Sequence, residues 1–341
     1  MRSEAVQDQH APSTSAIDSL VGQEMKVLDH GFVRLVDYMG SDSAIVQAAR
    51  VSYGRGTKKL SEDRGLIRYL MRHRHTTPFE MCEIKLHVKL PIFVARQWVR
   101  HRTANINEYS ARYSILDKEF YVPDRAYLVK LREEANERAL QDKALSEGQN
   151  DLFGVSRKDE ERLTTVGRQS ETNKQGRELD IDEVEALDHL KTIASISSRA
   201  YGVYERLLNE TSNGEKVSSA YSGLARELAR IVLPTNYYTQ WYWKTDLHNL
   251  FHFLSLRDDN HAQHEIRVYA QAIGEIVRQW VPLAWEAFID YRQNSVNLSG
   301  LEVDLIRKLL RGEKCDFASS GLSKREWKEI SEKLNLELPN S

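Results

Sequence analysis

The residues from position 100 to position 113 combine more chemically active side chains than any other window of the chain. This window, Arg100 to Tyr113, contains three arginines, one histidine, one glutamate, two asparagines and one serine. Guanidinium groups keep their charge and offer planar forks of N–H donors, which suits them to phosphate groups. A glutamate among them could orient an arginine or accept a hydrogen bond from a sugar hydroxyl. The window therefore predicts a phosphate-binding segment, and a solvated basic turn after a helix is the alternative.

A second group of candidate residues consists of four histidines, at His248, His252, His261 and His264. His248 and His252 are four residues apart on an expected helix and therefore lie on one face, a spacing that permits metal binding. Together with Asp258 and Asp259 they could describe a metal-dependent nucleotide phosphohydrolase. The sequence contains no H-E-x-x-H motif, and the histidines lie on both sides of an expected helix break, so we expect no metal.

The candidate nucleophiles of the chain have weak sequence support. Cys82 directly precedes Glu83, whose carboxylate would raise the pKa of the thiol, so Cys82 is predicted to be a small core residue. Ser110 lacks the G-x-S-x-G context of a serine nucleophile and is interpreted as a phosphate ligand. No G-x-G-x-x-G motif follows a strand and no P-loop is present, so neither of these phosphate-binding loops is expected.

Hydrophobic periodicity predicts the elements that carry these groups. Residues 83–90 alternate between apolar side chains and charged or polar ones, which is typical of a half-buried strand. Pro91 suits the first turn of a helix, and this helix would carry Gln97 and Arg100 toward the 100–113 window. Upstream, a strand is predicted for residues 32–38 and helices for residues 44–51 and 61–74.

The second half of the chain is expected to be mainly helical. Helices are predicted for residues 184–210, 217–232, 247–256 and 261–289. In the second of these, Leu224, Leu228 and Ile231 are spaced to face the core, and Asp246 is expected to cap the third. The aromatic residues between positions 236 and 244 predict a strand, although such a run could also stack the bases of a single-stranded nucleic acid.

The composition indicates a globular protein of the cytoplasm. Of the 341 residues, 41% are hydrophobic, and 48 lysines and arginines nearly balance 50 acidic residues, which argues against a surface that binds nucleic acid as a whole. The two cysteines, Cys82 and Cys315, form no disulfide framework and suit a reducing compartment. We recognise no apolar run typical of a signal peptide or a membrane span, so no membrane association is expected.

Composition also predicts how the chain is divided. Residues 1–25 are mostly polar and predict a mobile tail. Residues 26–295 are expected to form the main domain, which a charged insertion with few apolar anchors interrupts at about residues 124–182. We interpret this insertion as a solvated surface flap. Residues 296–341 predict a helical C-terminal appendage, with helices at 302–310 and 324–334.

The 100–113 window also resembles the signature of the flavin-dependent thymidylate synthases, R-H-R-x-x-S-x-N-E-x-S-x-R-Y. Eight of its nine specified positions match, and the departure is Asn105, where the family pattern has serine. Two further family patterns are present, H-x-T-P-F-E from His75 and L-R-x-D-x-H-A-Q from Leu256. The resemblance extends from about residue 31 to residue 291 with one long interruption, and it leaves out the C-terminal appendage.

This resemblance implies an α+β fold in which a mixed β-sheet is flanked by helices, assembled as a homotetramer with active sites at subunit junctions. It also implies the reductive methylation of dUMP to dTMP. The implied carbon donor is the folate 5,10-methylenetetrahydrofolate, and the hydride would come from FAD that NADPH has reduced. From the residues alone, a metal-dependent phosphohydrolase and a nucleic-acid-binding module remain as alternatives.

The same resemblance assigns roles to individual residues. Arg257 is the first catalytic candidate, because a fixed cation near the uracil would stabilise the negative charge that develops when C5 becomes nucleophilic. His75 is the second, for the flavin or for a proton-relay water. The implied dUMP-binding residues are Gln97, Trp98, Val99, Arg100, Glu108, Tyr109, Ser110, Ala111, Arg112, Arg230 and Arg257. The implied FAD-binding residues are Thr77, Arg100, His101, Arg102, Glu108, Asp246, Leu247, His248 and His252.

Two details qualify these assignments. In the family, the segment that corresponds to residues 108–112 acts from a neighbouring subunit, and Arg112 would contact the phosphate. Other members carry asparagine, arginine and asparagine where this chain has Asp246, His248 and His252. The contacts around the flavin are therefore expected to differ in detail.

Overall fold

The structure, a computed structural model, describes residues 15–51, 60–110, 112, 115–123, 168–169, 177–178, 183–313, 315–334, 336 and 338. Its contacts divide the chain into two compact units, residues 1–129 with 164–293 and residues 130–163 with 294–341. Most of the expected insertion lies outside the described residues, which there include only the short antiparallel pair β5 (Arg168–Gln169) and β6 (Arg177–Glu178). Within the expected N-terminal tail, α1 (Ser15–Asp18) is helical and its Ile17 is buried.

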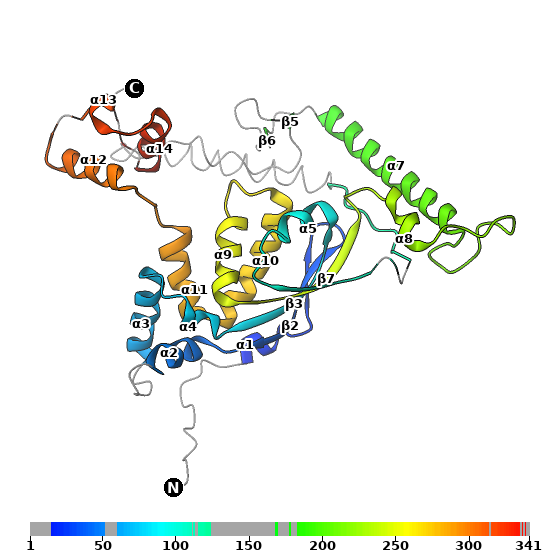
Figure 1. Ribbon diagram of the computed structural model, residues 1–341, viewed down its shortest axis with the longest axis horizontal. Helices are drawn as coiled ribbons and strands as arrows, with labels where there is room; N and C mark the ends of the chain where they lie inside the picture. The colour runs from blue at the N-terminus through cyan, green and yellow to red at the C-terminus, as the bar shows by residue number, and fades with distance from the viewer. Residues whose placement is uncertain are drawn as a thin grey trace, which may run out of the picture. The chain divides into compact units, whose positions relative to one another are not determined.

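A five-stranded sheet forms the centre of the first unit (Figure 1). Its strands, in spatial order, are β1 (Glu24–Val27), β2 (Gly31–Met39), β3 (Glu83–Pro91), β7 (Tyr238–Asp246) and β4 (Asn105–Glu108). All four pairings are antiparallel, so the expected α+β class is confirmed but the expected mixed sheet is wrong. Met39, the last residue of β2, pairs with Glu83, the first residue of β3. The helical connection between the two strands therefore leaves and re-enters the sheet at the same end of the strands. Such a connection yields antiparallel neighbours.

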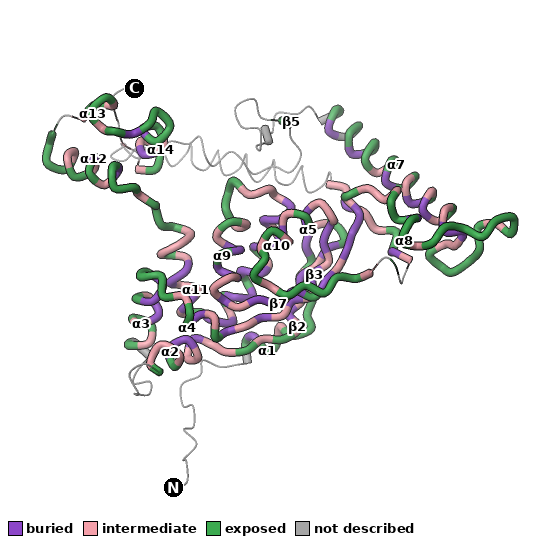
Figure 2. Tube along the Cα trace, viewed as in Figure 1, coloured by how far each residue is buried: buried purple, intermediate pink, exposed green. Residues whose placement is uncertain are grey.

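Strand β3 confirms the alternating pattern of its sequence. Ile84, Leu86, Val88 and Leu90 are buried, whereas the residues between them are only partly buried. Figure 1 shows α5 (Ile92–Trp98), α9 (Leu247–Arg257) and α10 (His264–Trp280) on one face of the sheet. The buried residues in Figure 2 concentrate where these helices face the strands. The aromatic segment predicted to be a strand is β7, and its Trp241 and Trp243 belong to this core.

The remaining helices of the first core pack near the end of the sheet where β3 begins. They are α2 (Asp42–Arg50), α3 (Leu60–Arg72), α4 (Thr77–Glu80) and α11 (Pro282–Phe288), which continues into the π-helical turn η3 (Ile289–Gln293). The single helix expected for residues 261–289 is wrong, because α10 ends at Trp280 and α11 begins at Pro282. Proline removes a backbone donor and clashes with the preceding turn. The Asp42 carboxylate accepts hydrogen bonds from the backbone N–H of Leu283 (2.8 Å) and Ala284 (2.9 Å), which caps the new helix.

A second correction concerns the helix expected for residues 217–232. Only α8 (Arg226–Ala229) and the 3₁₀ turn η2 (Arg230–Val232) are helical there, after the long helix α7 (Glu183–Leu208). The Asn209 side chain binds the backbone of Ser218 and Tyr221, and Gly223 has φ +83 at a point where a Cβ would overlap the Leu208 carbonyl. These contacts hold residues 218–223 in a non-helical path.

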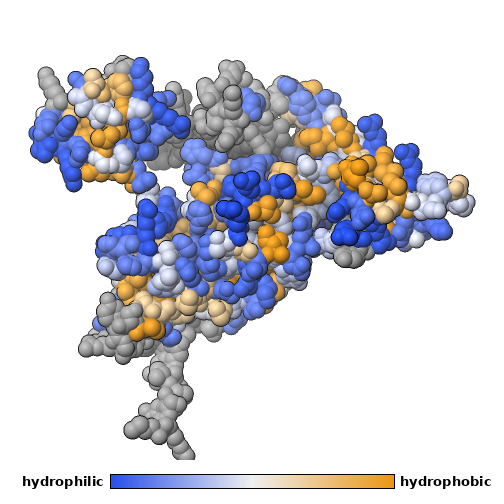
Figure 3. All heavy atoms as spheres, viewed as in Figure 1, coloured by the Kyte–Doolittle hydropathy of each residue, from blue (hydrophilic) through white to orange (hydrophobic). Residues whose placement is uncertain are grey.

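The three residues expected to face the core from this segment are instead exposed. Leu224, Leu228 and Ile231 have 47%, 54% and 74% of their surface accessible, respectively. Apolar side chains gather over α8 and η2 in the space-filling view (Figure 3). This apolar surface, formed by Leu224, Leu228 and Ile231, is available for contact with another molecule.

The described part of the second unit is helical, as expected for the C-terminal appendage. It contains α12 (Gly300–Leu310), α13 (Phe317–Ser320) and α14 (Lys324–Leu334). Its own core consists of Leu305, Leu322, Trp327 and Ile330. Ser299 and Glu302 form a capping box at the start of α12. Among the described residues of both units, no helix is both long and apolar enough to cross a membrane.

Candidate active site

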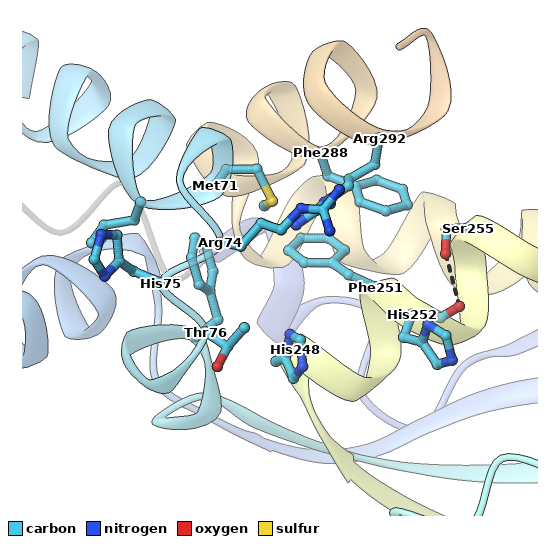
Figure 4. A pocket seen from close by; sticks show the side chains of 12 residues that line it. Met71, Arg74, His75, Thr76, His248, Phe251, His252, Ser255, Phe288 and Arg292 are labelled. Atoms are coloured by element: carbon cyan, nitrogen blue, oxygen red, sulfur yellow. Dashed lines mark hydrogen bonds between the residues drawn. The ribbon is translucent and has the colours of Figure 1, made fainter. Parts of the chain in front are cut away.

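A pocket of about 270 Å³ lies between α3, α4, α9 and the segment formed by α11 and η3 (Figure 4). Three of the predicted site residues, His75, His248 and His252, line it. The other lining residues are Leu70, Met71, Arg74, Thr76, Phe79, Phe251, Ser255, Phe288 and Arg292. Predicted residue Thr77 follows Thr76 directly and opens α4. The sequence pattern that starts at His75 and the two histidines of α9 therefore contribute to one cavity.

The pocket carries two arginines that no motif had assigned. Arg74 follows the end of α3 with φ 58, and its side chain extends toward that of Arg292 in Figure 4. Burial lowers the pKa of Arg292, and the charge of Arg74 lowers it further. Two cations that disfavour each other are relieved by an anion between them. Phe251 and Phe288 stack at 4.5 Å and provide an apolar wall, so the lining suits an anionic ligand with an aromatic or apolar part.

Arg257, the first catalytic candidate, lies at the last residue of α9 and contacts the start of the 100–113 window. Its Nε donates a hydrogen bond to Nε2 of His101 at 3.0 Å. Burial, the charge of Arg257 and that of His252 lower the pKa of His101 to about 4. At neutral pH His101 is therefore uncharged, with Nε2 as acceptor and the proton on Nδ1. The imidazole anchors the guanidinium without neutralising its charge.

The later part of the window forms a second group at the edge of the sheet. All four residues of β4 are exposed, and Glu108 accepts a hydrogen bond from the Thr239 hydroxyl at 2.7 Å. The backbone N–H of Tyr109 donates to the Gln240 carbonyl, and the Ser110 hydroxyl accepts from the backbone N–H of Arg112. Ala111 lies outside the described residues. The sheet edge thus orders the segment that resembles the phosphate-binding part of the signature.

Arg112 and Arg230, which are 118 positions apart in the sequence, meet at one glutamate. The Arg112 guanidinium lies 3.6 Å from the Glu227 carboxylate, and Nε of Arg230 donates to the backbone carbonyl of the same residue at 3.4 Å. Both predicted dUMP-binding arginines therefore belong to one group, which we call the Arg112–Arg230 group. Paired guanidinium groups at an exposed position are a suitable receptor for a phosphate.

The pocket and the Arg112–Arg230 group lie toward opposite ends of strand β7. Glu108 pairs with Trp241, whereas Asp246 at the far end of the strand caps α9 and accepts from the backbone N–H of Asn249 at 2.9 Å. Five strand residues span roughly 17 Å. The fold of one chain therefore does not bring these two groups together. Arg100 and Arg102 are exposed in the turn between α5 and β4.

Some predicted site residues have their side chains in the core. Trp98 is fully buried and packs against Trp241, Trp243 and Phe253, and Leu247 is fully buried at the start of α9. Only the backbone of these two residues could contact a ligand. Val99, at the end of α5, is partly buried.

The structure also places the residues on which the alternatives depended. Cys82 is a fully buried core residue, as predicted, and burial together with the charge of Asp42 raises the pKa of its thiol to about 12. His261 is exposed and lies 2.9 Å from Asp259. Across the described ranges, no three His, Cys, Asp or Glu side chains are grouped so that they could hold a metal ion.

Most of this chain is similar to known proteins. Residues 34–283 match the protein-family model described as thymidylate synthase complementing protein. The flavin-dependent thymidylate synthase of Rickettsia bellii is 49% identical over 317 residues, which cover 93% of this chain and 95% of that protein. The chain belongs to the flavin-dependent thymidylate synthase family. The Ruegeria pomeroyi member is 52% identical over 306 residues, which cover 90% of this chain and 86% of that protein.

A solved structure with a similar fold belongs to a related enzyme. The UMP/dUMP methylase PolB from Streptomyces cacaoi, bound with 5-Br UMP, superposes with a TM-score of 0.58 at 30% sequence identity. The match covers 80% of this chain and 99% of that one. A similar fold is therefore found in a nucleotide methylase.

Sequence reasoning missed several residues of the site. Arg74 lies in the basic run before His75, so the run itself was a usable signal. Arg292 lies outside every motif, in the π-helical turn η3 that follows α11. Glu227, which joins Arg112 and Arg230, lies in α8 and belongs to none of the motifs. No local pattern indicates either of the last two residues.

Proposed function

We propose that this chain methylates dUMP to dTMP, with 5,10-methylenetetrahydrofolate as the carbon donor and NADPH as the reductant of FAD. The single observation that supports this most is the contact between Arg257 and His101, next to a cationic pocket, in a member of this family. FAD, when bound, supplies the hydride of the reaction. The folate and NADPH are co-substrates in this proposal.

The pocket suits part of an FAD molecule. Its volume of about 270 Å³ is slightly below the ~300–1,000 Å³ typical of sites for small molecules. Arg74 and Arg292 match the charge of a diphosphate, and Phe251 and Phe288 match an aromatic or apolar surface. We infer that His248 and His252 contact the flavin here in place of the arginine and asparagine of other members. The rest of so large a cofactor would need a second surface.

In the proposed mechanism Arg257 acts on the pyrimidine. Its guanidinium stays charged although burial lowers its pKa, and a partly buried cation interacts more strongly with a developing negative charge than one in water. Placed near N3 and O4, it would stabilise the charge that makes C5 nucleophilic. His101 holds the cation in position as a neutral acceptor.

We further propose a homotetramer in which two subunits complete each active site. The separation of the pocket from the Arg112–Arg230 group along β7 supports this, because one nucleotide must reach a phosphate receptor and the flavin together. The exposed apolar surface of Leu224, Leu228 and Ile231 would suit a subunit interface. Light scattering should then give four times the chain mass of 39.4 kDa. A monomer would contradict the assembly.

The domain boundaries and the location of the protein are also proposals. We take residues 26–295 as the catalytic domain, with an insertion at about 124–182, and residues 296–341 as an appendage. The free thiols of Cys82 and Cys315 suit the reducing cytoplasm, which is where we place the reaction.

The absorption spectrum of the purified protein tests the proposed function. We expect flavin bands that bleach under anaerobic NADPH with dUMP, and dTMP that forms only when methylenetetrahydrofolate is added. Chromatography of the nucleotides measures the product, and omission of each co-substrate is the control. A colourless protein that does not take up added FAD would reject the proposal, as would a flavoprotein that never forms dTMP.

A further inference from the structure

A chain of side-chain hydrogen bonds runs behind Gln97, one of the residues expected to contact dUMP. Gln97 Nε2 donates to Oε1 of Gln263, whose own Nε2 donates to the Glu265 carboxylate at 2.8 Å. The Tyr121 hydroxyl donates to the other oxygen of Glu265 in a longer contact of 3.4 Å. We call Gln97, Gln263 and Glu265 the glutamine relay. It connects the last turn of α5 to the first turn of α10.

The buried end of the relay is suited to a negative charge. Glu265 is only 2% exposed and lies two positions after Gln263, the N-cap of the 17-residue helix α10. The N-terminal turn of a helix favours an anion, because its backbone N–H groups point toward it. The Gln263 amide and the Tyr121 hydroxyl both donate to the carboxylate of Glu265, so Glu265 is the acceptor in each of these contacts.

The acceptor role of Glu265 fixes the direction of every bond in the relay. Gln263 must turn its amide nitrogen to Glu265, which leaves its amide oxygen for Gln97. Gln97 must then donate its own nitrogen to Gln263, so its Oε1 is directed elsewhere. A glutamine amide alone could turn either way, because its nitrogen and oxygen ends are similar in size. Glu265 fixes the orientation of the Gln97 amide through two hydrogen bonds, from Gln263 to Glu265 and from Gln97 to Gln263.

We propose that Glu265 is a positioning residue that makes Gln97 present its amide oxygen to the nucleotide, so that the site selects a hydrogen-bond donor there. This inference rests on the proposed function, in which Gln97 contacts dUMP. The nucleotide offers one fixed donor, the N3–H of uracil; its 3′-hydroxyl can either donate or accept, and an ionised phosphate offers no donor. Cytosine has an acceptor at N3, so an oxygen placed opposite N3 would favour uracil.

The variant Glu265→Gln tests the inference, because it keeps the size of the side chain but allows it to donate. Gln263 and Gln97 can then turn over, and Gln97 can present nitrogen. We expect the affinity for dUMP to fall by about tenfold, since a donor would face a donor. Flavin content should stay that of the wild type. Calorimetric titration of the flavin-loaded protein measures binding of dUMP, dCMP and 2′,3′-dideoxyuridine monophosphate.

The three nucleotides identify which donor Gln97 meets. If it is the uracil N3–H, Glu265→Gln lowers the ratio of dUMP to dCMP affinity and leaves the effect of the 3′-hydroxyl unchanged. If it is the 3′-hydroxyl, which can also accept, the wild type binds dUMP more tightly than the dideoxy compound and the variant keeps this difference. The first result supports the relay, and the second would overturn it as a device that selects a donor. Equal losses for all three nucleotides would overturn it, because they would indicate a general loss of packing.

Two further variants complete the experiment. Glu275→Gln is the matched control, because Glu275 is an exposed glutamate of the same helix that pairs with Arg278. If Glu265→Gln binds dUMP as tightly as this control does, the relay would also be overturned. Gln263→Ala cuts the link without touching the buried carboxylate, and it should show the same loss of selectivity if Glu265→Gln fails to fold. A wild type that never methylates dUMP would instead count against the proposed function.

Discussion

Asp42 is a carboxylate that the fold buries at the start of α11. Only 3% of its surface is accessible, and it accepts hydrogen bonds from the backbone N–H groups of Leu283 and Ala284. These bonds lower the pKa of the carboxyl, but loss of hydration raises it by more, to about 6. Helix α11 leads to Phe288 and Arg292 in the pocket, so this buried acid supports one wall of the site.

The raised pKa of Asp42 predicts how stability depends on pH. The folded protein binds this proton more tightly than the unfolded chain, where the pKa of aspartate is about 3.9. Ionisation of Asp42 between pH 4 and pH 6 therefore lowers the free energy of unfolding as the pH rises, by up to about 3 kcal/mol. Asp42→Asn has no carboxyl group to ionise at this position. Its free energy of unfolding relative to that of the wild type should therefore increase between pH 4 and pH 6. Urea unfolding at pH 4.5 and pH 7 measures the difference, and an unchanged difference would contradict the prediction.

Arg257 gives a prediction about turnover. Arg257→Ala should lower the kcat of dTMP formation by about a hundredfold or more, because one preorganised cation is lost from the site of developing charge. The flavin should stay bound. Arg257→Lys should not restore turnover, since an ammonium group lacks the planar guanidinium whose Nε contacts His101. The rate of dTMP formation measures turnover, and the flavin absorbance measures how much flavin stays bound. Nearly normal turnover by either variant would show that Arg257 is not part of the mechanism.

Among single residues, the sequence predicted those that belong to a recognisable pattern. Arg257, His101 and the arginines of the window were found in this way, and Arg257 and His101 are in contact. Glu265 was not assigned any role, because its effect passes through Gln263 to a different helix. A hydrogen-bond partner that is distant in sequence has no local signal, so such residues become visible only when the helices are placed.

Strand β2 and helix α10 approach each other unusually closely at Gly31. A Cβ at this position would overlap the Tyr269 hydroxyl and would lie 2.6 Å from the Val27 carbonyl and 2.9 Å from that of Lys89. The Tyr269 hydroxyl itself donates to the Lys89 carbonyl at 2.7 Å. This tyrosine therefore joins the helix to the central strand across a space that only glycine leaves open.

Gly31→Ala should lower the free energy of unfolding by about 1–3 kcal/mol, because overpacking forces neighbouring atoms to shift. Adding Tyr269→Phe should recover only part of this loss, since the two backbone carbonyls remain close. Gly65→Ala is the control, because Gly65 lies in α3 with open space around it, and there alanine should be neutral or stabilising. Denaturant unfolding compares the three variants. Equal stabilities of Gly31→Ala and Gly65→Ala would disprove the close contact.

Among the elements, those with clear periodicity or a clear cap were predicted well. Strand β3, helix α9 with its Asp246 cap, and helix α14 all agree with their sequence patterns. The helix expected at residues 217–232 was wrong because its apolar spacing serves an exposed surface, while Asn209 and Gly223 fix the backbone otherwise. Spacing indicates which side chains share a face, but it does not indicate what covers that face.

At the scale of the whole molecule, the two units have separate cores. The family match, residues 34–283, covers most of the first unit, including its core residues from Leu35 to Val281, and also residues 130–163, which fall in the second unit. The second unit packs Leu305, Leu322, Trp327 and Ile330 against one another. The sequence predicted its two longer helices, but not α13, whose four residues are too few to show a period.

The distance between the pocket and the Arg112–Arg230 group has a genetic consequence. Arg112→Ala and Arg257→Ala should each be inactive alone, since each damages one half of every active site. If the halves come from different subunits, as proposed, cells that produce both variants will assemble mixed tetramers. About a quarter of their sites should then combine two undamaged halves, and a corresponding share of activity should return. Two defective alleles would thus complement each other, whereas halves supplied by the same chain would leave the mixture inactive.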